Sequence, residues 1–225
     1  MSALGRLARG VLPGLRQVHA QVARYAAAWD EANQRDLGVD GPLWVVLGDS
    51  TAQGIGAPSW ADGYVGQLRH ALDAGSERPW RVLNLSRSGA RSADVEDRQL
   101  PLLDARPAPP ADLVTCAIGA NDIVRRTPSA GLEAVLGRIM ARLPPRAVIA
   151  TLPKGLHGER TEAANRFIRA EAPGAGLVVA DVWAHTGPPW HGKLAADGFH
   201  PGALGYAEWA AAFAEALGVV LPPPP

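Results

Sequence analysis

The sequence predicts a parallel α/β fold in which a five-stranded sheet lies between layers of helices. Five short apolar runs recur along the 225 residues, and a segment with helical patterning follows each run. The runs are continuously apolar, as expected for strands that are covered on both faces. Alternating strands and helices with short connections predict a doubly wound sheet with right-handed crossovers. Ligands of such sheets bind beyond the carboxyl ends of the strands.

The predicted elements follow one another in a regular order. Pro101 is expected to bend or end the second helix, whereas Thr127 is expected to cap the third helix with Pro128 at its first position. The predicted strands are 43–47, 82–85, 113–118, 147–152 and 177–182, and the predicted helices are 60–75, 92–103, 127–143, 159–172 and 203–218.

Residues 1–40 are predicted to form a helical extension ahead of a domain that spans 41–220, and 221–225 a disordered tail. Leu15, Val18, Val22, Tyr25 and Trp29 recur at helical spacing and form one apolar stripe. This stripe is expected to pack on its own domain, with a dimer contact or a membrane-surface contact as alternatives.

Composition and charge exclude several classes of protein. The net charge is zero, which gives no indication of nucleic acid as a partner. No apolar stretch approaches the roughly 20 residues of a membrane-spanning helix. Arg6, Arg9 and Arg16 interrupt any signal-peptide core, so a cytoplasmic location is expected. The single cysteine, Cys116, cannot form an internal disulfide and is expected to be buried.

The stretch "LWVVLGDSTAQGIG" (43–56) runs from the first strand directly into a small polar corner that contains Ser50. A helix that began after Ser50 would point backbone N–H groups at whatever the hydroxyl attacks. A phosphate loop and a dinucleotide fingerprint both fit poorly, and the Gly-x-Ser-x-Gly elbow fails because Ala52 replaces its second glycine. The corner is therefore a plain turn or a site that presents a serine nucleophile.

Further polar positions follow the second and third strands and precede the last helix. Gly89 is either a turn glycine or a backbone donor open to close approach. Asn121 is a turn former or a donor to a developing negative oxygen, and Asp122 is expected to order its loop. Asp197 precedes His200 by three residues, which allows its carboxylate to orient the imidazole. All of these positions are predicted at one edge of the sheet.

In this order, "GDSTAQG", "SGA", "GAND" and "DGFHP" resemble the four sequence blocks of the SGNH, or GDSL-like, hydrolases. The resemblance extends over residues 43–217 and leaves 1–40 outside it. It implies a flavodoxin-like three-layer α/β/α sandwich, with the N-terminal helix as an addition. It also implies a serine esterase that acts on small ester or thioester substrates.

The resemblance further implies a role for each matching residue. Ser50 would be the nucleophile, His200 the general base and then acid, and Asp197 the residue that orients His200. The backbone N–H groups of Ser50 and Gly89 and the side-chain amide of Asn121 would form the oxyanion hole. Such a catalytic triad needs no metal and no organic cofactor.

The substrate and the acceptor stay open. Trp183, Trp190 and Phe199 are either acyl-pocket residues or ordinary packing. Arg87 and Arg125 are either contacts to an anionic substrate or a solvated rim. A carbohydrate O-acetylesterase and an acyltransferase are alternatives that would use the same serine. A zinc hydrolase using His185, His191 and His200 and a non-catalytic binding module of the same fold are the remaining rivals.

Overall fold

A five-stranded parallel sheet with the strand order β2-β1-β3-β4-β5 forms the centre of the structure. The structure is a computed structural model that describes residues 3–106, 110–156 and 158–221, with the backbone alone over 3–12. The predicted fold class is confirmed. The strands are β1 (Leu43–Gly48), β2 (Arg81–Asn84), β3 (Leu113–Ala117), β4 (Val148–Ala150) and β5 (Val178–Ala180).

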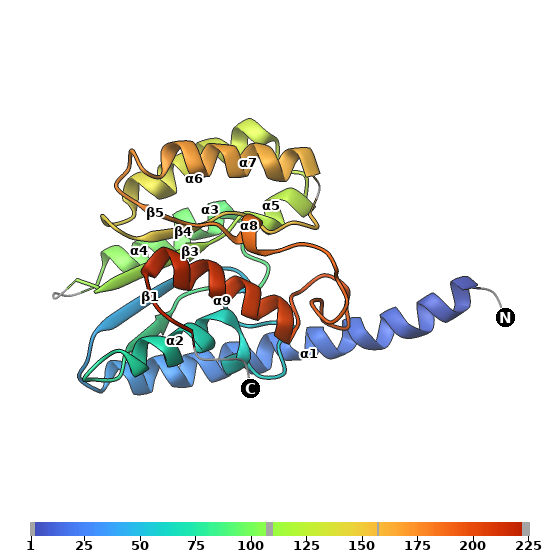
Figure 1. Cartoon of the computed structure of the whole chain (residues 1–225), viewed down its shortest axis with the longest axis horizontal. Coiled ribbons are helices and arrows are strands. Elements are labelled where there is room, and N and C mark those ends of the chain that lie inside the picture. The colour runs from blue at the N-terminus through green and yellow to red at the C-terminus, as the bar shows by residue number, and fades with distance from the viewer. Residues whose placement is uncertain (1–2, 107–109, 157, 222–225) are drawn as a thin grey trace.

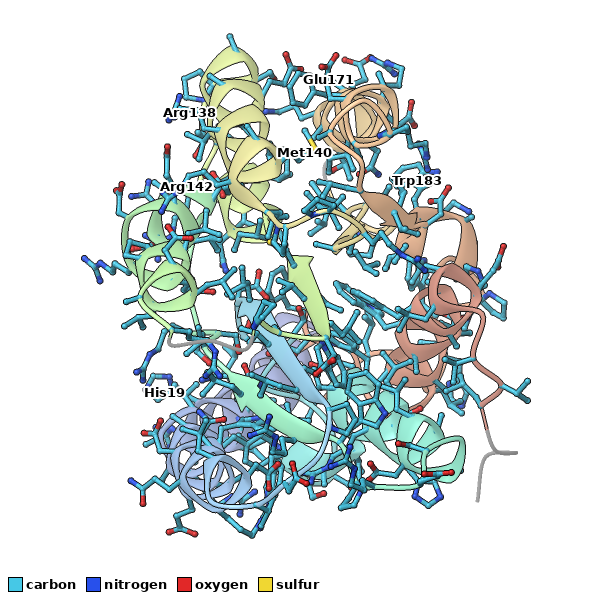
Figure 2. The ribbon with its side chains drawn as sticks, turned by 90° about the vertical axis from the view of Figure 1, so that its left-hand side faces the viewer. His19, Arg138, Met140, Arg142, Glu171 and Trp183 are labelled. Atoms are coloured by element: carbon cyan, nitrogen blue, oxygen red, sulfur yellow. The ribbon has the colours of Figure 1, made fainter. Side chains whose placement is uncertain are left out.

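Helices cover both faces of the sheet (Figure 1). One layer contains α1 (Ala3–Leu37), α2 (Tyr64–Ala74) and α9 (Ala203–Leu217), and the other contains α6 (Ser129–Arg142) and α7 (Gly158–Glu171). Side chains alternate along β1, so that Trp44 and Val46 enter the first core while Leu43, Val45 and Leu47 enter the second. Figure 2 labels Met140, which points inward from α6. Burial on both faces explains why these strands are continuously apolar.

The predicted helices 60–75 and 92–103 are divided into shorter segments, and two short helices at Ala120–Val124 and Val182–His185 were not predicted from the sequence patterns. The corner after Ser50 is a turn rather than the start of a helix, and the next helical segment begins at Trp60. The N-cap of α6 is Pro128 instead of Thr127, whose hydroxyl bonds Asp122. The short segments are η1 (Trp60–Asp62), α3 (Ser92–Asp94), the π-helical turn η2 (Val95–Gln99), α4 (Leu100–Asp104), α5 (Ala120–Val124) and α8 (Val182–His185).

Helix α1 packs along the β2 edge of the sheet. Asn33 exchanges hydrogen bonds with the backbone of Asn84, and the Asp36 carboxylate accepts one from the N–H of Val82. Tyr25 and Trp29 of the predicted apolar stripe are buried. The N-terminal end of α1 extends beyond the rest of the chain (Figure 1). The stripe therefore packs on its own chain over the part that is nearest the sheet.

Two further expectations concern the chain ends and membranes. Of the tail predicted at 221–225, residues 222–225 lie outside the described residues. Within the described ranges, no helix has both the length and the apolar character needed to cross a membrane.

Candidate active site

Ser50 lies in a tight turn beyond the carboxyl end of β1. The N–H of Ile55 donates to the carbonyl of Ser50, and the N–H of Gly54 donates to that of Thr51, which closes the turn. Ser50 is almost fully buried, and its Oγ lies 3.0 Å from the Nε2 of His200. The turn therefore presents the serine hydroxyl to an imidazole that is 150 positions away in the chain.

His200 is held in a compact loop before α9. The N–H of Ala195 donates to the carbonyl of His200 at 2.8 Å, and Leu194 forms an antiparallel bridge with Pro201. The loop lies directly against the serine turn. A Cβ added to Gly56 would lie only 2.4 Å from the carbonyl oxygen of Pro201. Only glycine allows this close approach between the two segments.

Asp197 binds the other side of the imidazole. Its Oδ2 lies 2.6 Å from the Nδ1 of His200, and its Oδ1 accepts hydrogen bonds from the N–H groups of Phe199 and His200. Burial opposes the negative charge, but the hydrogen bonds from these groups outweigh it and hold the pKa of the Asp197 carboxyl below its usual range. An ionised carboxylate only accepts hydrogen bonds, so Nδ1 carries the proton and Nε2 is free to accept from Ser50.

Asn121 contacts the serine turn from the strand next to β1, and Gly89 lines a shallow depression beside Ser88. The amide Nδ2 of Asn121 donates to the carbonyl of Ala90 at 3.0 Å, which places the Asn121 side chain beside the Gly89 loop. Among the described residues, neither the N–H of Ser50 nor that of Gly89 donates a hydrogen bond. These two backbone donors are therefore available to a ligand.

Gln53, which was not singled out from the sequence, joins the Gly89 loop to the serine turn. Its Nε2 donates to the carbonyl of Ser86 at 3.0 Å, and its Oε1 accepts from the hydroxyl of Ser88 at 2.6 Å. Gln53 is buried. It lies within the "GDSTAQG" motif, but its residue type gives no indication of its partners on another strand connection.

Asp49 is a second buried polar residue that the sequence reasoning missed. Its Oδ1 accepts hydrogen bonds from the N–H and the hydroxyl of Thr51, both at 2.9 Å. Among the described residues, its Oδ2 has one partner, the Nδ2 of Asn121 at 3.5 Å. Burial raises the pKa of the Asp49 carboxyl despite the bonds from Thr51. Asp49 therefore connects the serine turn to the Asn121 amide.

A cavity of about 230 Å³ opens beside Ser50 and His200. Trp190 and Phe199 line it. Its other apolar walls include Leu156, Leu194 and Trp209.

Three predicted substrate-binding residues do not line this cavity. Trp183 lies on α8, and the Lys154 ammonium lies 5.8 Å from the centre of the Trp183 ring. In Figure 2, Trp183 lies well away from His19 of α1. Arg125 is exposed at the C-cap of α5, because that short helix turns its end toward solvent. Arg87 is exposed beside Gly89, in a separate shallow depression.

The histidines of the zinc alternative have separate partners. His185 lies 2.8 Å from Glu215, whereas His200 is bonded to Asp197 and Ser50. Within the part of the chain that the structure describes, no three His, Cys, Asp or Glu side chains form a cluster that could hold a metal ion.

Known structures share this architecture. The structure titled TesA matches with 26% identity and a TM-score of 0.62, over 78% of this chain and 97% of its own. A family 3 carbohydrate esterase from Clostridium thermocellum (19% identity, TM-score 0.61) matches over 77% of this chain and 94% of its own. The salicylyl-acyltransferase SsfX3 of a tetracycline biosynthetic pathway (17% identity, TM-score 0.60) matches over 80% of this chain and 55% of its own.

The family comparison covers most of the chain. No curated protein matches it. A model of the GDSL-like lipase/acylhydrolase family matches residues 46–208, a span that begins within β1 and runs through the serine turn and His200 into α9. The chain therefore belongs to the GDSL-like lipase/acylhydrolase family and is a hydrolase of ester bonds.

Proposed function

We propose that the protein is a serine esterase in which Ser50, His200 and Asp197 act as the catalytic triad. The observation that carries the proposal is the continuous chain of contacts from Ser50 Oγ through the imidazole to the Asp197 carboxylate, at 3.0 and 2.6 Å. A serine hydroxyl is a weak nucleophile until an adjacent base takes its proton. His200 is in position to do this, and Asp197 holds it in the required tautomer.

In the first half of the reaction, Ser50 Oγ bonds to the ester carbonyl carbon and its proton moves to His200 Nε2. The carbonyl oxygen becomes negative and takes hydrogen bonds from the N–H groups of Ser50 and Gly89 and from the Asn121 amide, which gives up its long contact to Asp49 for this bond. The bond between the carbonyl carbon and the alcohol oxygen then breaks, and Nε2 returns the proton to that oxygen. The products are a free alcohol and an acyl-enzyme.

In the second half, water attacks the acyl carbonyl and gives its proton to Nε2. The bond to Ser50 Oγ breaks, and Oγ recovers the proton as the carboxylic acid leaves. The acyl group would occupy the cavity walled by Leu156, Trp190 and Phe199. A volume of about 230 Å³ suits a short or medium acyl chain.

We expect Ser50→Ala to lower kcat/KM for nitrophenyl butyrate by more than about 10⁴-fold, because the nucleophile is removed. Nitrophenol release measures the rate. Ser129→Ala, which changes an exposed serine on α6, is the matched control and retains the wild-type rate. Urea unfolding checks that both variants are folded. A folded Ser50→Ala protein with wild-type activity would show that another group is the nucleophile.

A further inference from the structure

A second recess adjoins His200 on the side facing α1. We call it the α1 groove. Leu15, Val18, His19 and Val22 lie on one face of the helix at intervals of three and four residues, which is the spacing of one helical face. The groove is lined by Leu15, Arg16, Val18, His19, Ala20 and Val22 from α1 and by Asp197 and His200 from the facing loop. It measures about 510 Å³ and is more open than the cavity at Ser50.

Close packing between α1 and the His200 loop holds the two walls of the groove together. A Cβ added to Gly14 would lie 2.0 Å from the carbonyl oxygen of Ala196, so the helix backbone lies directly against the loop. Val18 is buried with Ile55 and Ala195 at the base of the contact. Leu15, by contrast, is 46% exposed. The groove thus has a fixed base and an apolar side chain that is open to a ligand.

His200 lines both the cavity at Ser50 and the α1 groove. Under the mechanism proposed above, its Nε2 must give a proton to the leaving oxygen, so the alcohol part of the ester must contact this imidazole. The acyl part extends from the carbonyl carbon into the cavity. The alcohol part departs from the same carbon in another direction, and the α1 groove is the second recess that His200 lines.

We propose that the α1 groove binds the alcohol part of the substrate, and that this part is an apolar chain of several carbons. The inference rests on the proposed function. It goes beyond the family match, because the match begins at residue 46 and α1 lies wholly before it. The substrate class is therefore an ester that is apolar on both sides of the scissile bond.

Two ester series test the proposal, with acid release followed in a pH-stat. The first keeps a butyryl group and lengthens the alcohol from ethyl to octyl, and the second keeps the ethyl alcohol and lengthens the acyl chain. We expect the wild-type kcat/KM to rise with alcohol length by up to about fourfold for each methylene that the groove buries. Leu15→Glu should remove at least tenfold of the gain of the octyl ester over the ethyl ester, whereas the ratios of kcat/KM within the acyl series should stay those of the wild type.

Leu37→Glu is the matched control, since Leu37 is 49% exposed near the other end of the same helix. It should follow the wild type in both series. Equal losses on all esters in Leu15→Glu, or a wild-type rate independent of alcohol length, would overturn the proposal. So would a dimer that Leu15→Glu dissociates with no change in alcohol preference, because the groove would then be an interface between two copies.

The Ser50→Ala variant distinguishes failure of this inference from failure of the proposed function. If hydrolysis requires Ser50 but ignores alcohol length, only the role of the groove fails. If hydrolysis persists in Ser50→Ala, the proposed nucleophile fails as well.

Discussion

The Asp49 carboxylate has an unusual position beside Ser50. The carboxylate is buried, and one of its oxygens accepts two hydrogen bonds from Thr51. Among the described residues, its other oxygen has one contact, at 3.5 Å from the Asn121 amide. A buried carboxylate that lacks full hydrogen bonding is costly in its charged form. The raised pKa of Asp49 is the expected consequence of this burial.

We expect Asp49→Asn to gain stability relative to the wild type as the pH rises. The raised pKa means that the folded protein binds this proton more tightly than the unfolded chain, whose carboxyl has the ordinary value of 3.8. The contribution of Asp49 to the wild-type free energy of unfolding therefore falls as the pH rises above that value, until the folded carboxyl has ionised. The amide does not titrate, so the difference between the two proteins grows over this window.

Urea unfolding at closely spaced pH values from 3.5 upward measures that difference. Asp30→Asn, which alters an exposed carboxyl on α1, is the control and should show no comparable growth. A difference between Asp49→Asn and the wild type that stays constant with pH would contradict the assignment.

The sequence predicted residues whose chemistry can be read from their type. Ser50, Asn121, Asp197 and His200 follow strands or precede a helix, and the structure brings them to one edge of the sheet. Gln53 could not be found in this way, because its role depends on hydrogen bonds to Ser86 and Ser88, which lie on a different strand connection.

At the scale of elements, α1 holds the turn that follows Ser50. The Gln21 side chain accepts from the N–H of Gly56 at 2.7 Å and donates to the carbonyl of Ala57 at 3.1 Å. Tyr25 donates to the same carbonyl, and the Trp29 indole donates to that of Gln53. One helix face thus binds the backbone of the irregular segment that contains the serine turn.

Gln21→Ala should lower the free energy of unfolding by about 1–3 kcal/mol, because it leaves the N–H of Gly56 without its acceptor in a partly buried place. Urea unfolding with an unchanged slope measures the loss. Gln17→Ala, an exposed glutamine on the same helix, makes the same change in helix propensity and should shift stability by less than about 0.5 kcal/mol. Equal effects of the two substitutions would mean that the contact contributes nothing specific.

Element boundaries were less predictable than element types. Pro101 was expected to bend or end a helix over 92–103, yet the chain continues through the π-helical turn η2 into α4. Proline lacks an N–H, so it is tolerated in the first turn of α4, where the wider π-helical turn has already interrupted the regular bonding. The spacing of apolar residues in the sequence does not indicate a local change from α-helical to π-helical hydrogen bonding.

At the scale of the whole molecule, two separate cores hold the sheet between its helical layers. Leu136 of α6 is fully buried in the core shared with α7. The five strands were predictable because strands that are buried on both faces are continuously apolar. How α1 meets the loop of His200 was not, because Gly14 and Ala196 are far apart in the chain and neither carries a recognisable signal.

Leu136→Ala should lower the free energy of unfolding by about 2–5 kcal/mol, because it opens a cavity between α6 and the sheet. Thermal and urea unfolding measure the loss. Leu102→Ala, at a side chain that is 55% exposed, removes the same atoms from the surface and should cost less than about 1 kcal/mol. A loss for Leu136→Ala no larger than this control would indicate a core that collapses around the deletion.

The burial of Cys116 in β3 makes the molecule convenient for site-directed labelling. It is the one cysteine of the chain, and burial raises the pKa of its thiol to about 12. Maleimide reagents react with exposed thiolates, so the folded protein should stay unmodified at neutral pH. A cysteine introduced on the outer face of α1 would then carry a fluorophore alone, and its emission would report directly on whether this helix moves as an ester binds.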